Sequence, residues 1–149
     1  MPEIKPTMAF QRMAGHLIRR LHQLSHQRFQ AEAKAAGLDL TPVQYAAMEA
    51  VGANPGVDQA TVAALIAYDR ATIGGVIDRL EHKGLLAREV SETDRRARVL
   101  TLTEAGTALL DGFRPTVTRL QEDILGGLDE GERERFLGLA LKAAYGDDA

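Results

Sequence analysis

The stretch of sequence that decides the fold is LLAREVSETDRRARVLTLT, residues 85–103. Its ends, 85–90 and 98–102, are short extended runs, and the second alternates polar with apolar residues. Two such runs around a polar loop predict a β-hairpin. Within four residues the loop region gathers three arginines, Arg95, Arg96 and Arg98. Because the whole chain carries a formal net charge of −3, this basic point favours a focused contact with one polyanion over nonspecific binding.

Upstream of the hairpin, capping signals predict helices separated by short turns. The stretch Thr41-Pro42-Val43-Gln44 has the threonine, proline and glutamine of a helix start. Asp58 is expected to cap a short helix, and Asp69 is expected to cap the next helix, which ends at Gly84. Two short helices followed by a hairpin indicate a winged helix-turn-helix, so the predicted fold class is mainly α with a small β-hairpin.

Long amphipathic helices are predicted on both sides of this lobe. From Met8 to about Ala36 the apolar residues recur at spacings of three and four, which predicts one helix of about 43 Å. A second long helix follows Thr103, with Pro115 inside it, and a last helix starts at Asp129. These helices carry more apolar surface than one small lobe can cover, which predicts a C2 homodimer with a helical dimerisation region.

The predicted organisation is therefore one intertwined domain with three parts. Residues 1–36 form an N-terminal arm and dimerisation helix, residues 37–103 form the winged lobe, and residues 104–149 form the C-terminal dimerisation helices.

Three motifs resemble the MarR family of bacterial transcription regulators. Asp94-Arg95-Arg96 followed by Leu100-Thr101-Leu102-Thr103-Glu104-Ala105-Gly106 is similar to the family's wing signature. Leu40-Thr41-Pro42-Val43-Gln44-Tyr45 resembles the start of its second helix, and residues 69–86 resemble its recognition helix and the turn into the wing. The resemblance implies an obligate homodimer, a near-palindromic operator, and repression relieved by a small ligand.

The candidate DNA-binding residues lie on the predicted recognition helix and wing. A recognition helix enters the major groove, and wing arginines are attracted to the negative potential of a narrow minor groove. Arg96 falls on the family's wing arginine, and Asp94 is expected to brace it by a charge-assisted hydrogen bond. The full set is Arg70, Ala71, Thr72, Gly74, Gly75, Arg79, Arg95, Arg96 and Arg98.

Some of these assignments leave an alternative open. Gly74 and Gly75 would permit close approach either to DNA or to another helix, since mid-helix glycine otherwise costs about 1 kcal/mol relative to alanine. Arg95 and Arg98 could meet phosphates or neighbouring carboxylates.

A mixture of cationic and apolar residues on the first helix suggests an effector site. Arg20 would pair with a carboxylate and His16 would hydrogen-bond a ring substituent, which suits a small aromatic carboxylate. The candidate set, which could equally be ordinary packing and helix surface, is Met13, His16, Arg20, Tyr45 and Tyr68. His22 and His26 have metal-ligand spacing, but with no cysteine beside them a solvated or dimer-facing pair is favoured, so no metal site and no cofactor are expected.

Several classes of function are disfavoured. The chain has no cysteine and no glycine-rich phosphate loop, and its one pair of histidines at metal-ligand spacing, His22 and His26, has no further ligand beside it. We therefore expect no enzyme activity. No apolar run approaches the roughly 18 residues of a membrane helix, and the N-terminus lacks signal-peptide features, so a cytoplasmic location is expected. The main alternative function is a winged-helix protein-interaction module that does not bind DNA, which the acidic net charge favours weakly.

Overall fold

The computed structural model describes residues 4–147, and this part of the chain divides into two compact units. The central unit is Phe29–Val117. The terminal unit comprises the residues up to Arg28 and those from Thr118 onward. Helices α1 (Ala14–Ala35) and α5 (Glu104–Ile124) contribute residues to both units, while α6 (Glu130–Tyr145) belongs to the terminal unit. No helix within residues 4–147 combines the length and the apolar character needed to cross a membrane.

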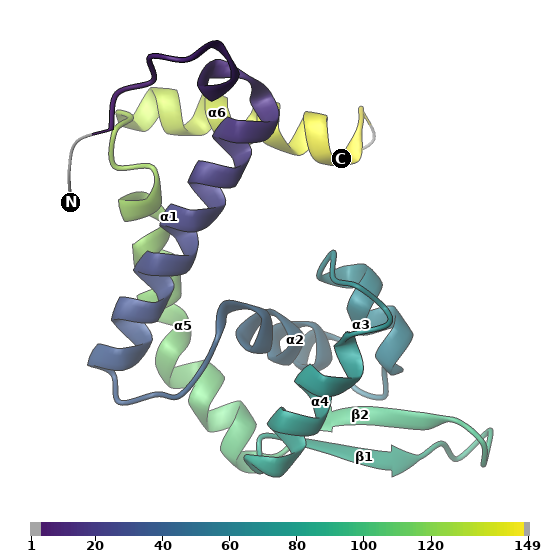
Figure 1. The fold of residues 1–149 in the computed structure, drawn as a ribbon. Coiled ribbons are helices and arrows are strands. Elements are labelled where there is room, and N and C mark those ends of the chain that lie inside the picture. Colours follow the sequence, from purple (N-terminus) through teal and green to yellow (C-terminus); the bar gives the residue numbers. More distant parts are fainter. Residues whose placement is uncertain (1–3, 148–149) are drawn as a thin grey trace. The chain divides into compact units, whose positions relative to one another are not determined.

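The central unit is the winged helix-turn-helix that the sequence predicts, so the expected fold class is confirmed (Figure 1). It contains α2 (Pro42–Ala53), α3 (Gln59–Leu65), α4 (Ile73–His82), β1 (Leu86–Val90) and β2 (Arg98–Leu102). The caps predicted at Thr41 and Asp58 form as expected, because Thr41 Oγ1 accepts from the Gln44 N–H at 3.2 Å and Asp58 Oδ1 accepts from the Thr61 N–H at 2.7 Å. Both helices therefore begin where their capping residues place them.

The start of α4 differs from the prediction. Asp69 was expected to cap this helix, but the helix begins at Ile73. Asp69 instead heads a separate turn, in which its carboxylate accepts from the Ala71 N–H at 3.0 Å and its carbonyl accepts from the Thr72 and Ile73 N–H groups. A short aspartate side chain that bonds its own backbone two residues on competes with helix formation. Arg70 and Thr72 therefore precede the helix rather than occupying its first turn.

Strands β1 and β2 pair antiparallel, with Leu86 opposite Leu102 and Val90 opposite Arg98. An additional bridge joins Val57, in the turn before α3, to Leu100 of β2. Figure 1 shows the hairpin extending beyond the helices of this unit, with the loop of residues 91–97 at its free end. This arrangement exposes the basic loop while the base of the hairpin packs on the helices.

The core of the central unit draws on every one of its helices and on the hairpin. The contact between α5 and the base of the hairpin is especially close, because a Cβ built on Gly106 would overlap the Leu85 carbonyl oxygen. Glycine at position 106 is therefore required for this packing. The largest fully buried side chains of this unit are Met48, Val51, Val62, Ile73, Ile77, Leu80, Leu86, Leu100 and Leu110.

The terminal unit also departs from the prediction at one place. The sequence predicts a single helix from Met8 to Ala36, but residues Ala9–Arg12 form a 3₁₀ helix and Met13 is extended before α1 begins. The Gln11 side chain accepts a hydrogen bond from the Met8 N–H at 2.9 Å and completes this separate turn. Hydrophobic spacing continues across the break, which is why periodicity alone missed it. Of the predicted N-terminal arm, residues 1–3 lie outside the described residues.

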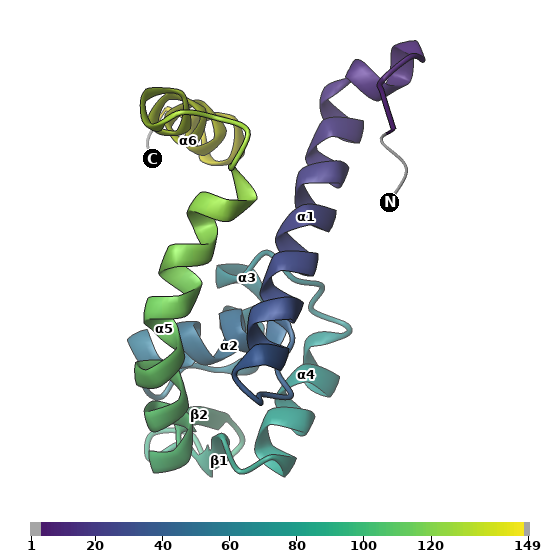
Figure 2. The same cartoon turned by 90° about the vertical axis from the view of Figure 1, so that its left-hand side faces the viewer.

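The remaining helices agree with the sequence prediction. Gly37, at φ 72°, follows the end of α1, and Asp129 with Glu132 forms the capping box that starts α6. Helix α5 contains Pro115 and still runs from Glu104 to Ile124; Figure 2 shows it as one helix.

Candidate nucleic-acid interface and effector residues

The segment that leads into α4 presents exposed polar residues. Arg70, Ala71 and Thr72 are all exposed, and the turn that holds them is closed by hydrogen bonds to Asp69. Upstream, the backbone N–H of Thr61, with a smaller contribution from the positive charge of Arg70, lowers the pKa of the Asp58 carboxyl. Arg70 is thus close enough to the start of α3 to act electrostatically on its cap, and its guanidinium remains accessible.

The two glycines of α4 occupy different environments. A Cβ on Gly74 would lie 3.3 Å from Gln59 Nε2, whereas a Cβ on Gly75 would have nothing within 4 Å. Gly74 therefore faces a side chain of α3, and Gly75 faces open space. Arg79, one turn further along, is exposed.

The hairpin loop has an internal hydrogen-bond framework that leaves its arginines free to project. Ser91 Oγ accepts from the backbone N–H groups of Thr93 and Asp94, each at 3.3 Å. Asp94 Oδ1 accepts from the backbone N–H of Arg96 at 3.0 Å, so the aspartate holds the backbone of this residue. Arg95, Arg96 and Arg98 are exposed.

One residue that sequence reasoning missed is Arg88 on β1. It was read only as part of an extended run, yet the structure places its guanidinium against residues of α3 and α4. The signal was available in the sequence, because Arg88 shares a strand face with Leu86, which is 2% exposed. A charged side chain on the buried face of a strand needs polar partners, so such a position indicates a structural ion pair.

Three of the five predicted effector residues belong to the terminal unit. Met13 is exposed in the break before α1, and Arg20 is exposed on α1. His16 packs edge-on against Phe10, with ring centroids 5.2 Å apart. Its Nε2 atom is buried and has no hydrogen-bond partner in the described part of the chain. A buried nitrogen without a partner is uncommon, since it loses solvation without compensation.

The other two predicted effector residues, Tyr45 and Tyr68, belong to the central unit. The Tyr45 ring packs against Phe29 and Phe113, and its hydroxyl donates to Glu49 Oε1 at 2.9 Å. The same Glu49 oxygen lies 3.0 Å from Arg114 Nε. Burial, then the hydrogen bond to Glu49 and its negative charge, raise the pKa of Tyr45 to about 12. Tyr45 also borders a hollow of about 520 Å³ between α2 and the end of α3.

Tyr68 differs from Tyr45 in being 37% exposed, in the turn that follows α3. Its backbone N–H donates to the Ala63 carbonyl at 2.9 Å, so the turn is ordered while the ring remains accessible.

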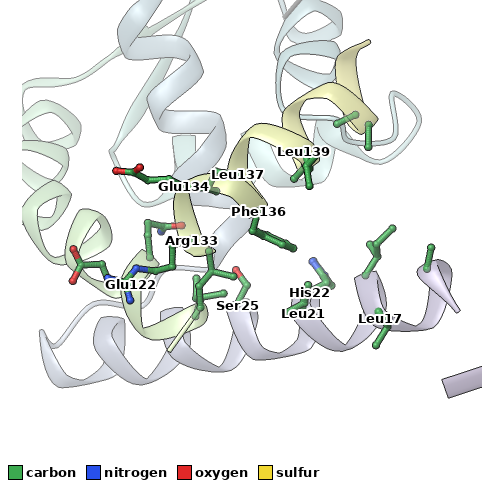
Figure 3. A pocket seen from close by; sticks show the side chains of 18 of the residues that line it. Leu17, Leu21, His22, Ser25, Glu122, Arg133, Glu134, Phe136, Leu137 and Leu139 are labelled. Atoms are coloured by element: carbon green, nitrogen blue, oxygen red, sulfur yellow. The ribbon is translucent and has the colours of Figure 1, made fainter. Parts of the chain in front are cut away.

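Within the terminal unit, side chains of α1, α5 and α6 line an open, mainly apolar groove of about 1000 Å³. Figure 3 shows Leu17 and Leu21 of α1 on one side and Phe136 and Leu139 of α6 on the other, with His22 between them. Among residues 4–147 no group of three metal-ligating side chains occurs.

Comparison with known proteins identifies relatives across nearly the whole chain. Residues 38–97 match the MarR family. The transcriptional regulator HosA of Escherichia coli is 34% identical over 91% of this chain and 97% of its own length.

Two solved structures are also similar to this one. BpsR of Bordetella bronchiseptica, whose DNA binding is described as regulated by 6-hydroxynicotinic acid, is 31% identical with a TM-score of 0.84, covering 94% of this chain and 99% of that one. The transcriptional repressor CouR, bound to a 23-mer DNA duplex, is 29% identical with a TM-score of 0.82, covering 95% and 99%. With the winged lobe and its basic loop, these similarities show that the chain belongs to the MarR family of transcriptional regulators.

Proposed function

We propose that this regulator is a ligand-responsive repressor that binds a near-palindromic DNA operator as a homodimer, and that it acts by binding and not by catalysis. The observation that carries the proposal is that one compact unit presents both an exposed basic loop and a capped helix-turn-helix. CouR, a repressor similar over nearly the whole chain, is bound to DNA in its solved structure. We infer a cytoplasmic location from this role.

The exposed residues of the central unit suit two grooves of B-DNA. The α4 region, with Arg70, Thr72, Gly75 and Arg79, would enter the major groove, where base edges present distinct donor and acceptor patterns. Arg95 and Arg96 would approach the adjacent minor groove, where a narrow A·T tract concentrates negative potential. Arg98 would contact a phosphate. Gly74 contributes by packing, since its missing Cβ accommodates Gln59.

The homodimer is supported by the apolar surface of the terminal unit. Leu139 and Tyr145 of α6 are 63% and 73% exposed, and α6 contains no buried residue. Apolar surface of this extent on a regulator marks an interface, and a second copy of the chain is the occupant that a palindromic operator requires. Two recognition helices related by a two-fold axis would contact half-sites about 34 Å apart.

A gel-shift titration with the intergenic DNA upstream of the gene for this regulator tests the proposal. We expect a single retarded complex that a scrambled duplex does not compete away, with two protomers per operator by light scattering. A chain that binds no operator fragment would contradict repression and favour the protein-interaction module.

For the effector, we propose a small aromatic acid. BpsR is described as regulated by such a compound, 6-hydroxynicotinic acid. On this chain, Arg20 supplies an accessible cation and His16 a buried nitrogen without a partner, one for a carboxylate and one for a ring substituent. Met13, in the same unit, is proposed to contact the ring.

Calorimetry with benzoates, hydroxybenzoates and hydroxypyridine carboxylates tests this proposal. We expect one compound to bind and to release the operator, because a ligand dissociates DNA only when it prefers the form that cannot bind DNA. Binding should be lost in both Arg20→Ala and His16→Ala, while Arg19→Ala on the same helix serves as the matched control. Binding that survives both substitutions would refute the site.

A further inference from the structure

Arg88 on β1 makes polar contacts with both helices of the helix-turn-helix. Its Nη1 atom lies 2.6 Å from Asp78 Oδ1 and 3.2 Å from Glu81 Oε1, two carboxylates of α4. Its Nη2 atom donates to Gln59 Oε1 at 3.2 Å, on the first residue of α3. The backbone N–H of Arg88 also donates to Glu81 Oε2 at 3.3 Å. One side chain thus connects the wing to α3 and α4.

The environment of Arg88 makes this contact more specific than an ordinary surface ion pair. The Arg88 side chain is only 20% exposed, while those of Asp78 and Glu81 are 66% and 43% exposed. Exposed ion pairs contribute little because solvent screens them and their side chains must be ordered. A planar guanidinium that satisfies three acceptors at once adds directional hydrogen bonds, which fix geometry as well as charge.

Gly74 leaves room on α4 for the third contact. A Cβ at this position would lie 3.3 Å from Gln59 Nε2, tighter than most van der Waals contacts. Glycine lets the Gln59 amide lie against α4 with its oxygen on Arg88. The cluster of Gln59, Asp78, Glu81 and Arg88, which we call the wing clamp, is therefore built into the surface of α4.

A hairpin of two strands is marginally stable by itself, so its orientation depends on what holds its base. We propose that Arg88 is a positioning residue for operator binding, which holds the wing at a fixed orientation to α4 so that Arg96 and the recognition helix reach the DNA together. This inference rests on the DNA binding proposed above. Because its guanidinium is engaged by two carboxylates of the same chain, we expect Arg88 to hold the wing and not to bind a phosphate.

A double-mutant cycle between Arg88→Gln and Arg96→Ala tests this coupling. We expect Arg88→Gln to weaken operator binding about tenfold, the scale of one lost hydrogen bond to a charged group. Arg96→Ala should cost about tenfold in the unaltered chain but only about twofold in the Arg88→Gln background, because a wing without the clamp no longer holds residue 96 on the DNA. The concentration of active protein is determined by stoichiometric titration, so that partial unfolding is not mistaken for weaker binding.

The salt dependence separates positioning from direct contact, and Arg98→Gln is the matched control. Both substitutions remove one positive charge from the hairpin, one on each strand. Arg98→Gln should reduce the slope of log affinity against log salt by about 1, as for one lost phosphate contact, while Arg88→Gln leaves the slope unchanged. Arg88→Lys keeps the charge but not the planar fork, so it should recover only part of the lost affinity.

Three results would overturn the inference: additive effects of Arg88→Gln and Arg96→Ala, a salt slope that falls in Arg88→Gln as in Arg98→Gln, or full recovery by Arg88→Lys. Failure of the unaltered chain to bind any operator would instead contradict the proposed function, so the two failures are distinguishable.

Discussion

The central and terminal units differ most in what a single chain buries. Within residues 4–147, every hydrophobic side chain of the buried core belongs to the central unit except Leu120. In the terminal unit α6 starts at a complete capping box, yet it contains no fully buried residue. Capping decides where a helix begins, whereas most helical stability in proteins comes from packing an apolar face. The comparison indicates that the central unit is complete in one chain and that the terminal unit needs a second.

The largest effect on stability is expected from a substitution that creates a cavity in the core of the central unit. Leu100 is 1% exposed and lies on β2, where it also bridges to Val57. Leu100→Ala should lower the free energy of unfolding by about 2–5 kcal/mol, because a buried leucine leaves a cavity as well as losing its transfer free energy. Urea denaturation followed by circular dichroism measures this change.

Leu139→Ala on α6 is the matched substitution for that experiment, since Leu139 is 63% exposed in one chain. Leu139→Ala should lower the free energy of unfolding more at high protein concentration than at low concentration, because it removes a contact between two chains. A loss as large as that of Leu100→Ala at all concentrations would contradict the contrast between the units.

The next effect concerns assembly. Leu139→Asp would place an unpaired carboxylate in the proposed interface, where burying a charge without a partner costs several kcal/mol. We expect the dimer dissociation constant to rise at least about 100-fold, as measured by analytical ultracentrifugation. Glu134→Lys, at an exposed position on the other side of the same helix, should leave it nearly unchanged. A Leu139→Asp chain that remains dimeric would show that α6 is not the interface.

A smaller effect is expected at the wing. Arg96→Ala should weaken operator binding by about 1–3 kcal/mol, the scale of one specific contact, and should leave both folding and dimerisation intact because Arg96 is exposed. Fluorescence anisotropy with a labelled operator measures the affinity. If Arg96→Ala binds as tightly as the unaltered chain while Arg70→Ala does not, the assignment of the wing is wrong.

The smallest effect depends on pH and is confined to the central unit. The fold raises the pKa of Tyr45 to about 12, so it favours the neutral phenol. This contribution to stability is complete below the ordinary tyrosine pKa of 10.0 and is lost as the pH rises from there toward about 12. Tyr45→Phe should cost about 1 kcal/mol near neutral pH, because it removes the hydrogen bond to Glu49.

Urea denaturation across the alkaline range measures this dependence, and the advantage of the unaltered chain over Tyr45→Phe should shrink above pH 10. A difference in stability that stays constant up to about pH 12 would contradict the role of the phenolic proton.

Features decided by neighbouring residues could be predicted from the sequence. Thr41 and Asp58 cap their helices through bonds to residues three positions away, and the alternation of 98–102 places Leu100 on the inner face of the hairpin. The same local rules failed at Asp69 because one side chain can serve a turn or a helix cap, and only the surrounding structure decides between them.

The rest depends on contacts between residues far apart in the sequence. Arg88 and Gln59 are separated by 29 positions, and no local sequence pattern around either residue predicts that the two are in contact. Gly74 could be read as open to DNA or to a helix until Gln59 was located beside it. The break at Met13 was hidden because hydrophobic spacing continues across it.

The close approach of Gly106 to the Leu85 carbonyl has a consequence for building chimeras. Thr103 Oγ1 donates to the Gly84 carbonyl at 2.6 Å, the Thr103 N–H donates to the Leu85 carbonyl, and no side chain fits at position 106. The two ends of the segment 84–106 are therefore held together by direct contacts with each other. A wing exchanged between regulators should be transplanted as this whole cassette, because a graft that divides it would separate a glycine from the carbonyl that requires it.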